Sequence, residues 1–248
     1  MKKVNYFLGL LFVLLGCSSD NESVTNSVSI AILVKKAVTS SLVFEYNYNG
    51  NKFTEFNIGN NKIVHTYTGN LITNIKRYNL GSSELEFENR FTYDANQKLI
   101  EEVNLFYSNN TAEKRVYTYN NDIITFQVYS GNFLNQNTIG NSGIIYKNTF
   151  GDVAKVENYN GANLLNKTEY TYDSKNSIFK NALGYDKLVS IFESGKVNNI
   201  TSSTTFNDGG DIINQYNNIY TYNSSNFPIA VTTSFIGSTS TSTTEYNY

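Results

Sequence analysis

The residue types that most often perform catalysis near neutral pH are scarce in this chain. His65 is its one histidine and Cys17 its one cysteine. A serine or cysteine nucleophile needs a base such as histidine beside it, and no nucleophile motif accompanies His65. Zinc sites take several cysteine or histidine ligands, which this composition does not provide. Triad hydrolysis and zinc chemistry are therefore disfavoured, and the sequence predicts no cofactor.

The composition still allows catalysis by a pair of carboxylates, because glycoside hydrolysis needs only two acids at a set separation. The densest acidic group consists of Glu84, Glu86, Glu88, Glu101 and Glu102. Alternate residues of a strand share a face, so the first three are expected together on a polar face. We expect these charges to be solvated and to discourage association between strands, with a carboxylate-based hydrolase as the alternative.

A second group of oxygen ligands lies in the turn at residues 207–211. Asp208 and Asp211 there are suited to a hard cation such as calcium. A twelve-residue calcium loop brings more ligands than this turn contains. We expect a plain β-turn, and Asp208 and Asp211 are the only metal candidates that the sequence offers.

Aromatic residues are abundant, with 20 tyrosines, 16 phenylalanines and no tryptophan. A tyrosine on a strand offers a flat apolar face and a hydroxyl, which suit sugar stacking, a protein interface or cross-strand pairing. Seven tyrosines recur at intervals of 26, 26, 27, 26, 50 and 26 residues: Tyr67, Tyr93, Tyr119, Tyr146, Tyr172, Tyr222 and Tyr248. This regularity favours a structural role as anchors of a repeat, with one anchor missing near Val197.

A repeat of about 26 residues has room for two strands and two turns, because a strand advances ~3.3 Å per residue and usually runs 3–10 residues. Asn49-Gly50, between the alternating segments Leu42–Tyr48 and Asn51–Ile58, is a strong hairpin signal. Polar turns follow about every 10–15 residues along the chain. Each repeat is therefore predicted to be a β-hairpin, too short for a crossover helix.

The sequence predicts an all-β fold, a single antiparallel β-meander of about 16–18 strands. A sheet of that width curves strongly or closes into a barrel, since strand twist accumulates and unpaired edges invite association. Only Ile178–Tyr185 interrupts the strand rhythm, and we expect a loop or short helical turn there. One domain is predicted, over residues 30–248.

The dipeptide Tyr93-Asp94 opens a polar turn that Asp94 is expected to close through its side chain, and it recurs as Tyr172-Asp173. These units resemble the YD repeats of Rhs-type and teneurin-type shells, although Gln97 stands where that family has glycine. The degenerate pattern is similar to YD-like lipoproteins of Bacteroidota, some of which are described as having a porin-like fold. The resemblance implies a fold and brings no activity with it.

The first residues have the features of a bacterial lipoprotein signal. A basic pair precedes a short apolar core, and Leu14, Leu15, Gly16 and Cys17 match the lipobox at which such signals are cleaved. The apolar core is too short to span a ~30 Å bilayer as a helix. We therefore predict a signal peptide over residues 1–16 and acylation of Cys17, which anchors the protein to a membrane.

Residues 17–29 are rich in Ser, Asn and Thr and predict a flexible polar tether behind the acylated cysteine. Ser18 stands where an inner-membrane retention signal has aspartate, and Asp20 and Glu22 resemble the export signal of Bacteroidota surface lipoproteins. An ordinary polar tether would have a similar composition. These features predict a lipid-anchored, outer-membrane protein exposed at the cell surface.

Removal of the signal with its two lysines takes the formal net charge from −2 to −4. Nucleic acids are bound through clustered lysine and arginine, so they are not expected as partners. The expected partners are the membrane, through the lipid, and a glycan or surface-protein ligand. The sequence does not indicate an oligomeric state.

We predict a non-enzymatic binding or scaffold module. An integral outer-membrane β-barrel is the alternative, because the terminal Tyr248 resembles the closing-strand signal of such barrels. The polar face expected for the strand Glu84–Tyr93 argues against it, since lipid contact needs an apolar band ~25 Å tall. A carboxylate-based polysaccharide hydrolase is the third hypothesis.

Overall fold

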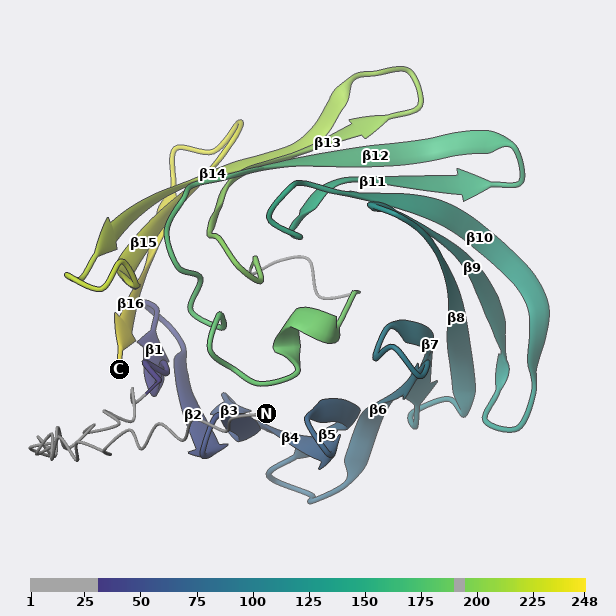
Figure 1. Cartoon of the computed structure of the whole chain (residues 1–248), viewed down its shortest axis with the longest axis horizontal. Coiled ribbons are helices and arrows are strands. Elements are labelled where there is room, and N and C mark those ends of the chain that lie inside the picture. Colours follow the sequence, from purple (N-terminus) through teal and green to yellow (C-terminus); the bar gives the residue numbers. More distant parts are fainter. Residues whose placement is uncertain (1–30, 190–194) are drawn as a thin grey trace, which may run out of the picture. The chain divides into compact units, whose positions relative to one another are not determined.

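The computed structural model describes residues 31–189 and 195–248. The predicted signal peptide, the lipobox with Cys17 and the tether lie outside the described residues. The described residues form sixteen strands that pair antiparallel with their neighbours and close into a barrel (Figure 1). The prediction of an all-β antiparallel meander is confirmed, and of the two predicted forms, a strongly curved sheet or a closed barrel, the structure has the closed barrel.

The shortest strand closes the barrel. β1 pairs with β16 on one side and with β2 on the other, which leaves no bare edge among the described strands. The strands are β1 (Lys36–Val38), β2 (Val43–Asn49), β3 (Lys52–Ile58), β4 (Asn61–Thr68), β5 (Leu71–Asn79), β6 (Leu85–Tyr93), β7 (Leu99–Phe106), β8 (Thr111–Asn120), β9 (Ile123–Asn132), β10 (Gln136–Lys147), β11 (Val153–Asn160), β12 (Asn163–Tyr172), β13 (Ile200–Asn207), β14 (Ile212–Tyr222), β15 (Pro228–Phe235) and β16 (Thr241–Asn247).

The two faces of the barrel differ in chemistry, as β2 illustrates. Its Phe44, Tyr46 and Tyr48 point into the barrel, while Glu45 and Asn47 point outward. Buried aromatic and aliphatic side chains gather on the inner face around the barrel. Charged residues recur on the outward face: Glu45, Glu55, Lys62, Lys76, Glu88, Arg90, Lys114, Lys155, Glu157, Lys167, Glu169 and Glu245.

β-Bulges recur where several of the tyrosine anchors stand. The register shifts fall at Thr66/Tyr67, Thr92/Tyr93, Thr171/Tyr172 and Thr221/Tyr222. These tyrosines end even-numbered strands of an up-and-down barrel, so the bulges all lie at one end, which we call the repeat-turn end. A bulge adds one residue against the partner strand and re-aims the side chain that it carries.

The connection between β12 and β13 folds back into the barrel (Figure 1). We call this connection the plug; its described residues are 173–189 and 195–199 and include the short 3-10 helix η1 (Tyr185–Lys187). Phe179, Leu188 and Val189 of the plug are buried in the same core cluster as Phe53 of β3. The loop or short helical turn predicted at Ile178–Tyr185 is confirmed. The plug also accounts for the missing repeat anchor near Val197, because it occupies that interval. No helix in the described part of the chain is long and apolar enough to cross a membrane.

Candidate functional site

Most tyrosine anchors are tied to the barrel wall through their hydroxyl groups. Tyr93 Oη donates a 2.7 Å hydrogen bond to the carbonyl oxygen of Ile72, at the start of the preceding strand. Tyr119 Oη donates one of 2.8 Å to Leu99 in the same way. The equivalent bonds join Tyr172 to Val153 at 2.6 Å and Tyr248 to Pro228 at 2.8 Å. One tyrosine per hairpin therefore fastens two neighbouring strands at the repeat-turn end.

The residue after the anchor caps the turn. Asp94 Oδ1 accepts hydrogen bonds from the backbone N–H groups of Asn96 at 2.8 Å and Lys98 at 2.9 Å, as predicted. Asn148 and Asn223 accept the same pair of bonds in their own turns. The carboxylate or amide oxygens of these caps thus stabilise the turns by accepting backbone hydrogen bonds.

Two further anchor residues hold the plug. Asp173 accepts hydrogen bonds from the backbone N–H groups of Lys175 at 2.9 Å and Asn199 at 3.1 Å, and from the hydroxyl of Tyr222. Lys175 and Asn199 lie at the two ends of the plug, and Tyr222 lies on β14. Asp173 therefore ties both ends of the plug to the barrel wall. Tyr67 is the second of these residues, since its hydroxyl donates a 3.1 Å hydrogen bond to the carbonyl oxygen of Leu183 in the plug.

Tyr146 differs from the other six anchors. It lies on the outward face, where its hydroxyl donates a 3.0 Å hydrogen bond to Glu157. The register shift in this repeat falls between Tyr146 and Lys147, and the cap that follows is Asn148. Lys147 therefore takes the anchor position of this repeat, one residue later than the tyrosine spacing predicts.

Asp152 joins the plug to the turn between β10 and β11. This carboxylate is 1% exposed, and it accepts backbone hydrogen bonds from Lys196 at 2.8 Å, Val197 at 2.9 Å and Asn198 at 3.1 Å. Three successive N–H groups form a concave anion-binding nest. Burial, followed by the charge of Lys147, lowers the pKa of the Lys196 ammonium to about 7.

The acidic residues considered for hydrolysis are divided between the two faces. Glu102 points inward and accepts a 2.9 Å hydrogen bond from Tyr117. Glu88 lies on the outward face but is only 4% exposed, which corrects the expectation of a solvated charge. Arg90 Nε and the Tyr107 hydroxyl each donate a 2.8 Å hydrogen bond to the Glu88 carboxylate and cover it. Burial raises the pKa of Glu88, but the hydrogen bonds from Arg90 and Tyr107 outweigh burial and lower that pKa to about 2.

The metal candidates Asp208 and Asp211 lie in the exposed turn between β13 and β14. Asp208 Oδ1 accepts the backbone N–H of Gly209 at 3.0 Å, and Asp211 Oδ2 accepts the side-chain amide of Asn207 at 3.1 Å. Both carboxylates are thus engaged in the turn itself. No group of three or more His, Cys, Asp or Glu side chains suited to a metal occurs among the described residues.

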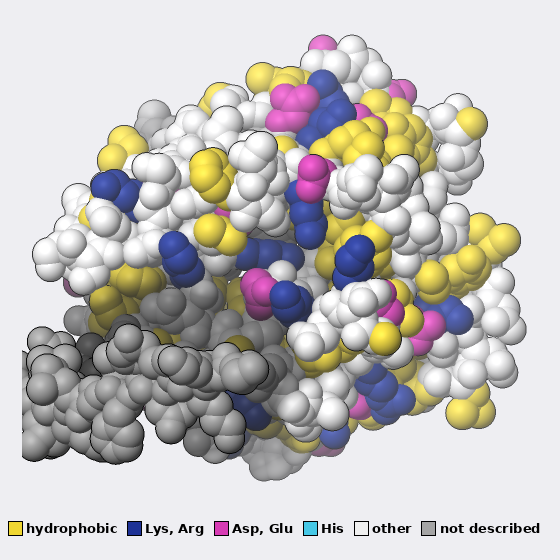
Figure 2. Space-filling view, in the orientation of Figure 1, with side chains coloured by type: hydrophobic (Ala, Val, Ile, Leu, Met, Phe, Trp, Pro, Cys, Tyr) yellow, Lys and Arg dark blue, Asp and Glu magenta, His cyan; other side chains and the backbone are white. Residues whose placement is uncertain are grey.

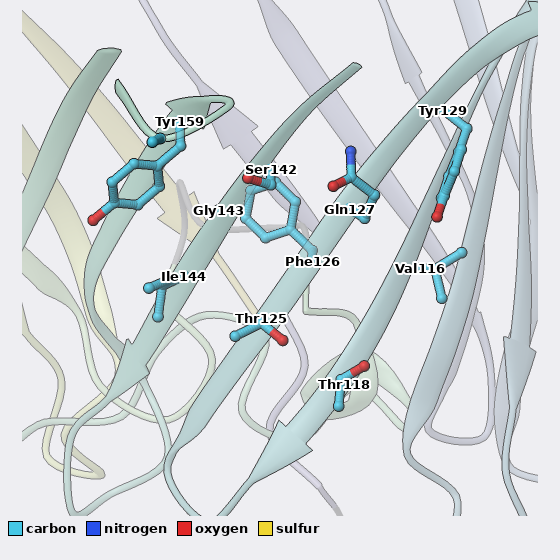
Figure 3. Close-up of a pocket in the computed structure, with 11 residues that line it drawn as sticks. Val116, Thr118, Thr125, Phe126, Gln127, Tyr129, Ser142, Gly143, Ile144 and Tyr159 are labelled. Atoms are coloured by element: carbon cyan, nitrogen blue, oxygen red, sulfur yellow. The ribbon is translucent and has the colours of Figure 1, made fainter. Parts of the chain in front are cut away.

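A shallow groove of about 580 Å³ crosses β8 to β11 on the outer surface (Figure 3). Tyr129 and Tyr159 stand at its two sides, with the polar side chains of Gln127 and Ser142 between them (Figure 3). Gly143 also lines the groove, and a side chain is excluded there, because a Cβ atom would come within 2.5 Å of the Glu157 carbonyl oxygen.

A second cavity, of about 660 Å³, lies inside the barrel between the plug and strands β1 to β5 and β16. We call it the aromatic chamber, since its lining includes Phe44, Tyr46, Phe53, Phe56, Phe179 and Tyr246. No Lys, Arg, Asp or Glu lines it among the described residues. A pocket with mostly apolar walls and few polar groups is typical of small-molecule sites.

His65 is the one titratable imidazole in the wall of this chamber. It is 7% exposed, and its ring centroid lies 4.5 Å from that of Phe53. Burial lowers the pKa of His65 to about 4, against the opposing effect of a backbone hydrogen bond with Thr54. The ring is therefore neutral near pH 7. Its buried Nδ1 has no hydrogen-bond partner in the described part of the chain.

A third cavity, of about 420 Å³, adjoins the aromatic chamber, with which it shares Ile178, Thr244 and Tyr246. We call it the polar chamber, because the side-chain amides of Asn214 and Asn218 and hydroxyl groups such as that of Thr233 line it. Neither chamber was marked in the sequence. Their walls combine the plug with strands from both ends of the chain, and only the long interval between Tyr172 and Tyr222 hinted at an inserted segment.

The fold is shared with solved structures of porin-like proteins. One, from Bacteroides vulgatus, has 13% sequence identity and a TM-score of 0.57, over 88% of this chain and 99% of that one. Another, from Bacteroides uniformis, has 11% identity and a TM-score of 0.51, over 86% and 94%. No family model and no curated protein matches the sequence. At these identities the likeness shows a common fold alone, and the porin-like fold predicted from the sequence is confirmed.

Proposed function

We propose that the protein is a lipid-anchored outer-membrane protein whose barrel lies outside the bilayer and binds a ligand. The polar outward face of the barrel carries this proposal. A membrane-spanning barrel presents an apolar band ~25 Å tall to lipid. Here Lys62 pairs with Glu55 at 2.8 Å, and Lys155 with Glu157 at 2.6 Å, on that face. Figure 2 looks onto one end of the barrel, where basic and acidic side chains stand among apolar ones.

The filled interior favours binding over diffusion through a pore. Barrels of 16–18 strands that act as porins leave an aqueous channel. In this barrel the plug buries Phe179, Leu188 and Val189 against the inner wall, and Asp152 and Asp173 hold the plug in place. A plug that is held in place fills the interior, and this arrangement favours ligand binding over passage through a channel.

Attachment through Cys17 completes the proposal. The lipobox supports acylation, and the likeness to porin-like proteins of Bacteroides supports an outer-membrane location. The acidic residues Asp20 and Glu22 favour export to the cell surface. The tether of residues 17–29 would then separate the barrel from the lipid.

Fractionation of cells tests this proposal. The wild-type chain is expected in the outer-membrane fraction and accessible to protease on intact cells. A Cys17→Ser variant, with residues 1–16 exchanged for a signal peptide cleaved without lipidation, is expected to be soluble without detergent. Ser18→Ala, in a chain that keeps its own signal, serves as the control and stays membrane-bound. A Cys17→Ser barrel that resists alkaline extraction would establish the integral-barrel alternative instead.

A non-enzymatic role is part of the proposal. The acidic group that a hydrolase would use is divided, with Glu88 held by Arg90 outside and Glu102 held by Tyr117 inside. A polysaccharide screen is expected to yield no products. Hydrolysis that disappears in Glu88→Gln or Glu102→Gln would support the hydrolase hypothesis.

The outer groove is the surface that suits a glycan ligand, because Tyr129 and Tyr159 flank polar side chains there (Figure 3). A glycan array probed with the soluble chain is expected to lose signal in Tyr129→Ala. Ile219→Ala, at an exposed outward position on β14, is the matched control. Equal signals from both variants would direct attention to a surface-protein ligand.

A further inference from the structure

We propose that the barrel interior is a binding site for an uncharged, amphipathic small molecule. Its apolar body packs in the aromatic chamber, and one of its hydrogen-bond donors pairs with Nδ1 of His65, a buried atom that the ring turns towards the chamber when the ligand enters. This inference goes beyond the glycan surface proposed above, since it adds a second class of ligand and a second place of binding, inside the barrel. It rests on the binding role and does not depend on the membrane anchor.

The aromatic chamber has the size and the walls for such a ligand. Its volume of about 660 Å³ falls within the range of small-molecule pockets, ~300–1,000 Å³. The ring centroids of Phe53 and Phe179 lie 6.0 Å apart, and those of Tyr46 and Phe56 lie 5.8 Å apart. Rings from the barrel wall and from the plug thus meet at the cavity. Because no charged side chain lines the chamber among the described residues, an uncharged ligand suits it.

The orphan nitrogen of His65 indicates what the ligand contributes. Buried polar atoms are paired in the great majority of cases, and an unpaired one calls for an explanation. We assign the acceptor of the neutral ring to Nδ1, because a backbone hydrogen bond with Thr54 engages the ring and Nδ1 is the nitrogen without a partner among the described residues. A hydroxyl or N–H group of the ligand would satisfy it. A phenylalanine would fill the same space among Phe53 and Phe56 without this polar atom.

The polar chamber continues the site and gives access to it. It meets the aromatic chamber at Thr244 and reaches the exposed Asn214 and Phe235, at the barrel end opposite the repeat turns. Ile213 and Ile236 beside that opening are each 59% exposed. A ligand with a polar end would therefore leave that end among amide and hydroxyl groups near solvent.

N-phenyl-1-naphthylamine is a suitable probe, because it is uncharged, aromatic and carries a single N–H donor. Its emission is expected to rise on addition of the full chain bearing Cys17→Ser in detergent-free buffer. If that chain needs detergent, the anchoring proposal fails, while the comparison of variants below is still made in the same detergent. An emission that does not rise would overturn the binding proposal alone.

Filling the junction of the chambers locates the binding. Thr244→Trp places an indole where the two chambers meet and is expected to weaken binding about tenfold or more. Thr243→Trp, on the exposed outward face of the same strand, is the matched control and should bind within about twofold of wild type. Thr244→Leu, a smaller change, covers the case in which the tryptophan variant does not fold. Equal affinity in the inward and outward variants would place the probe elsewhere and refute the site.

The role of His65 is tested with a second probe, 1-benzylnaphthalene, in which a methylene group replaces the bridging N–H and the overall shape is similar. His65→Phe is expected to weaken the amine about tenfold but the hydrocarbon less than about twofold. An equal change for both probes would mean that His65 only packs. Thermal unfolding of each variant shows whether its barrel is intact.

Discussion

The neutrality of His65 has a consequence for stability. In the folded chain its pKa is about 4, because burial among aromatic rings penalises the charged form, whereas an unfolded histidine titrates near 6.5. Between these values the unfolded state binds the proton and the folded state does not. The stability contributed by the neutral ring is therefore fully present above pH 6.5 and is lost as pH falls towards 4.

We predict that the free energy of unfolding falls as pH drops from 7 to 4.5, by up to about 3 kcal/mol from His65 alone. Denaturant unfolding at a series of pH values measures it. His65→Phe should remove the part of the pH dependence of the unfolding free energy that is due to His65. The part that is due to carboxylates such as Glu88 should remain. A variant with the same slope as wild type would mean that His65 does not contribute.

Gln97 stores strain in the best-preserved repeat turn. Its φ of 61° lies in the left-handed region, which costs a residue with a Cβ atom roughly 1–2 kcal/mol. Gln97→Gly is therefore expected to stabilise the protein by about 0.5–1 kcal/mol, a rise in the thermal midpoint. Ala95→Gly in the same turn lacks a positive φ to relieve and should destabilise. The prediction fails if both glycines lower the midpoint.

At the scale of the hairpin, the tyrosine period has a physical cause. Each bulge at the repeat-turn end aims a tyrosine at the first residues of the preceding strand, as Tyr93 does at Ile72. The cap Asp94 fixes the turn that follows, so anchor and cap act as one unit. Since a hairpin needs one such fastening, the tyrosine recurs once per hairpin.

Loss of a single fastening should be measurable. Tyr93→Phe removes the hydroxyl and leaves the Ile72 carbonyl oxygen without this donor, so we expect a loss of about 1 kcal/mol in unfolding free energy. Tyr146→Phe on the outward face should cost less than about 0.5 kcal/mol, because water can replace its bond. Equal losses would argue against a special role for the inward tyrosines.

At the scale of the whole molecule, the plug decides what the barrel interior is. It brings Phe179 into the wall of the aromatic chamber and is held by the buried carboxylate of Asp152. Asp152→Ala would leave three backbone N–H groups near residue 197 without their acceptor. The cost is expected to be about 3 kcal/mol or more.

Limited trypsin digestion measures this effect on the plug itself. In Asp152→Ala, cleavage after Lys187 or Lys196 is expected to become faster than in wild type, because the plug leaves the barrel more often. Asp208→Ala, in an exposed turn at the other barrel end, is the control and should leave the rate unchanged. Unchanged cleavage in Asp152→Ala would show that other contacts suffice.

The sequence by itself determined the fold class and the hairpin repeat from which the sheet is built. Three local signals predict the fold: alternation in strands such as Glu84–Tyr93, the hairpin signal Asn49-Gly50 and the tyrosine period. They are sufficient because the two strands of an antiparallel hairpin are neighbours in the sequence. The all-β meander and the cap at Asp94 could therefore be predicted, whereas a strongly curved open sheet and a closed barrel remained alternatives until the pairing of β1 with β16 was known. The strand count fell within the predicted range, because turns of fixed spacing bound every strand.

Only the tertiary structure decided what lies inside the barrel and which charges are buried. Tyr67 bonds Leu183 across 116 residues, and Asn181 bonds Ile32 across 149, distances at which no local pattern carries information. Glu88 is buried because Tyr107 from the next hairpin segment folds over it, which strand alternation does not encode. The plug, the two chambers and the orphan nitrogen of His65 arise in the same way, from residues brought together only when the barrel closes.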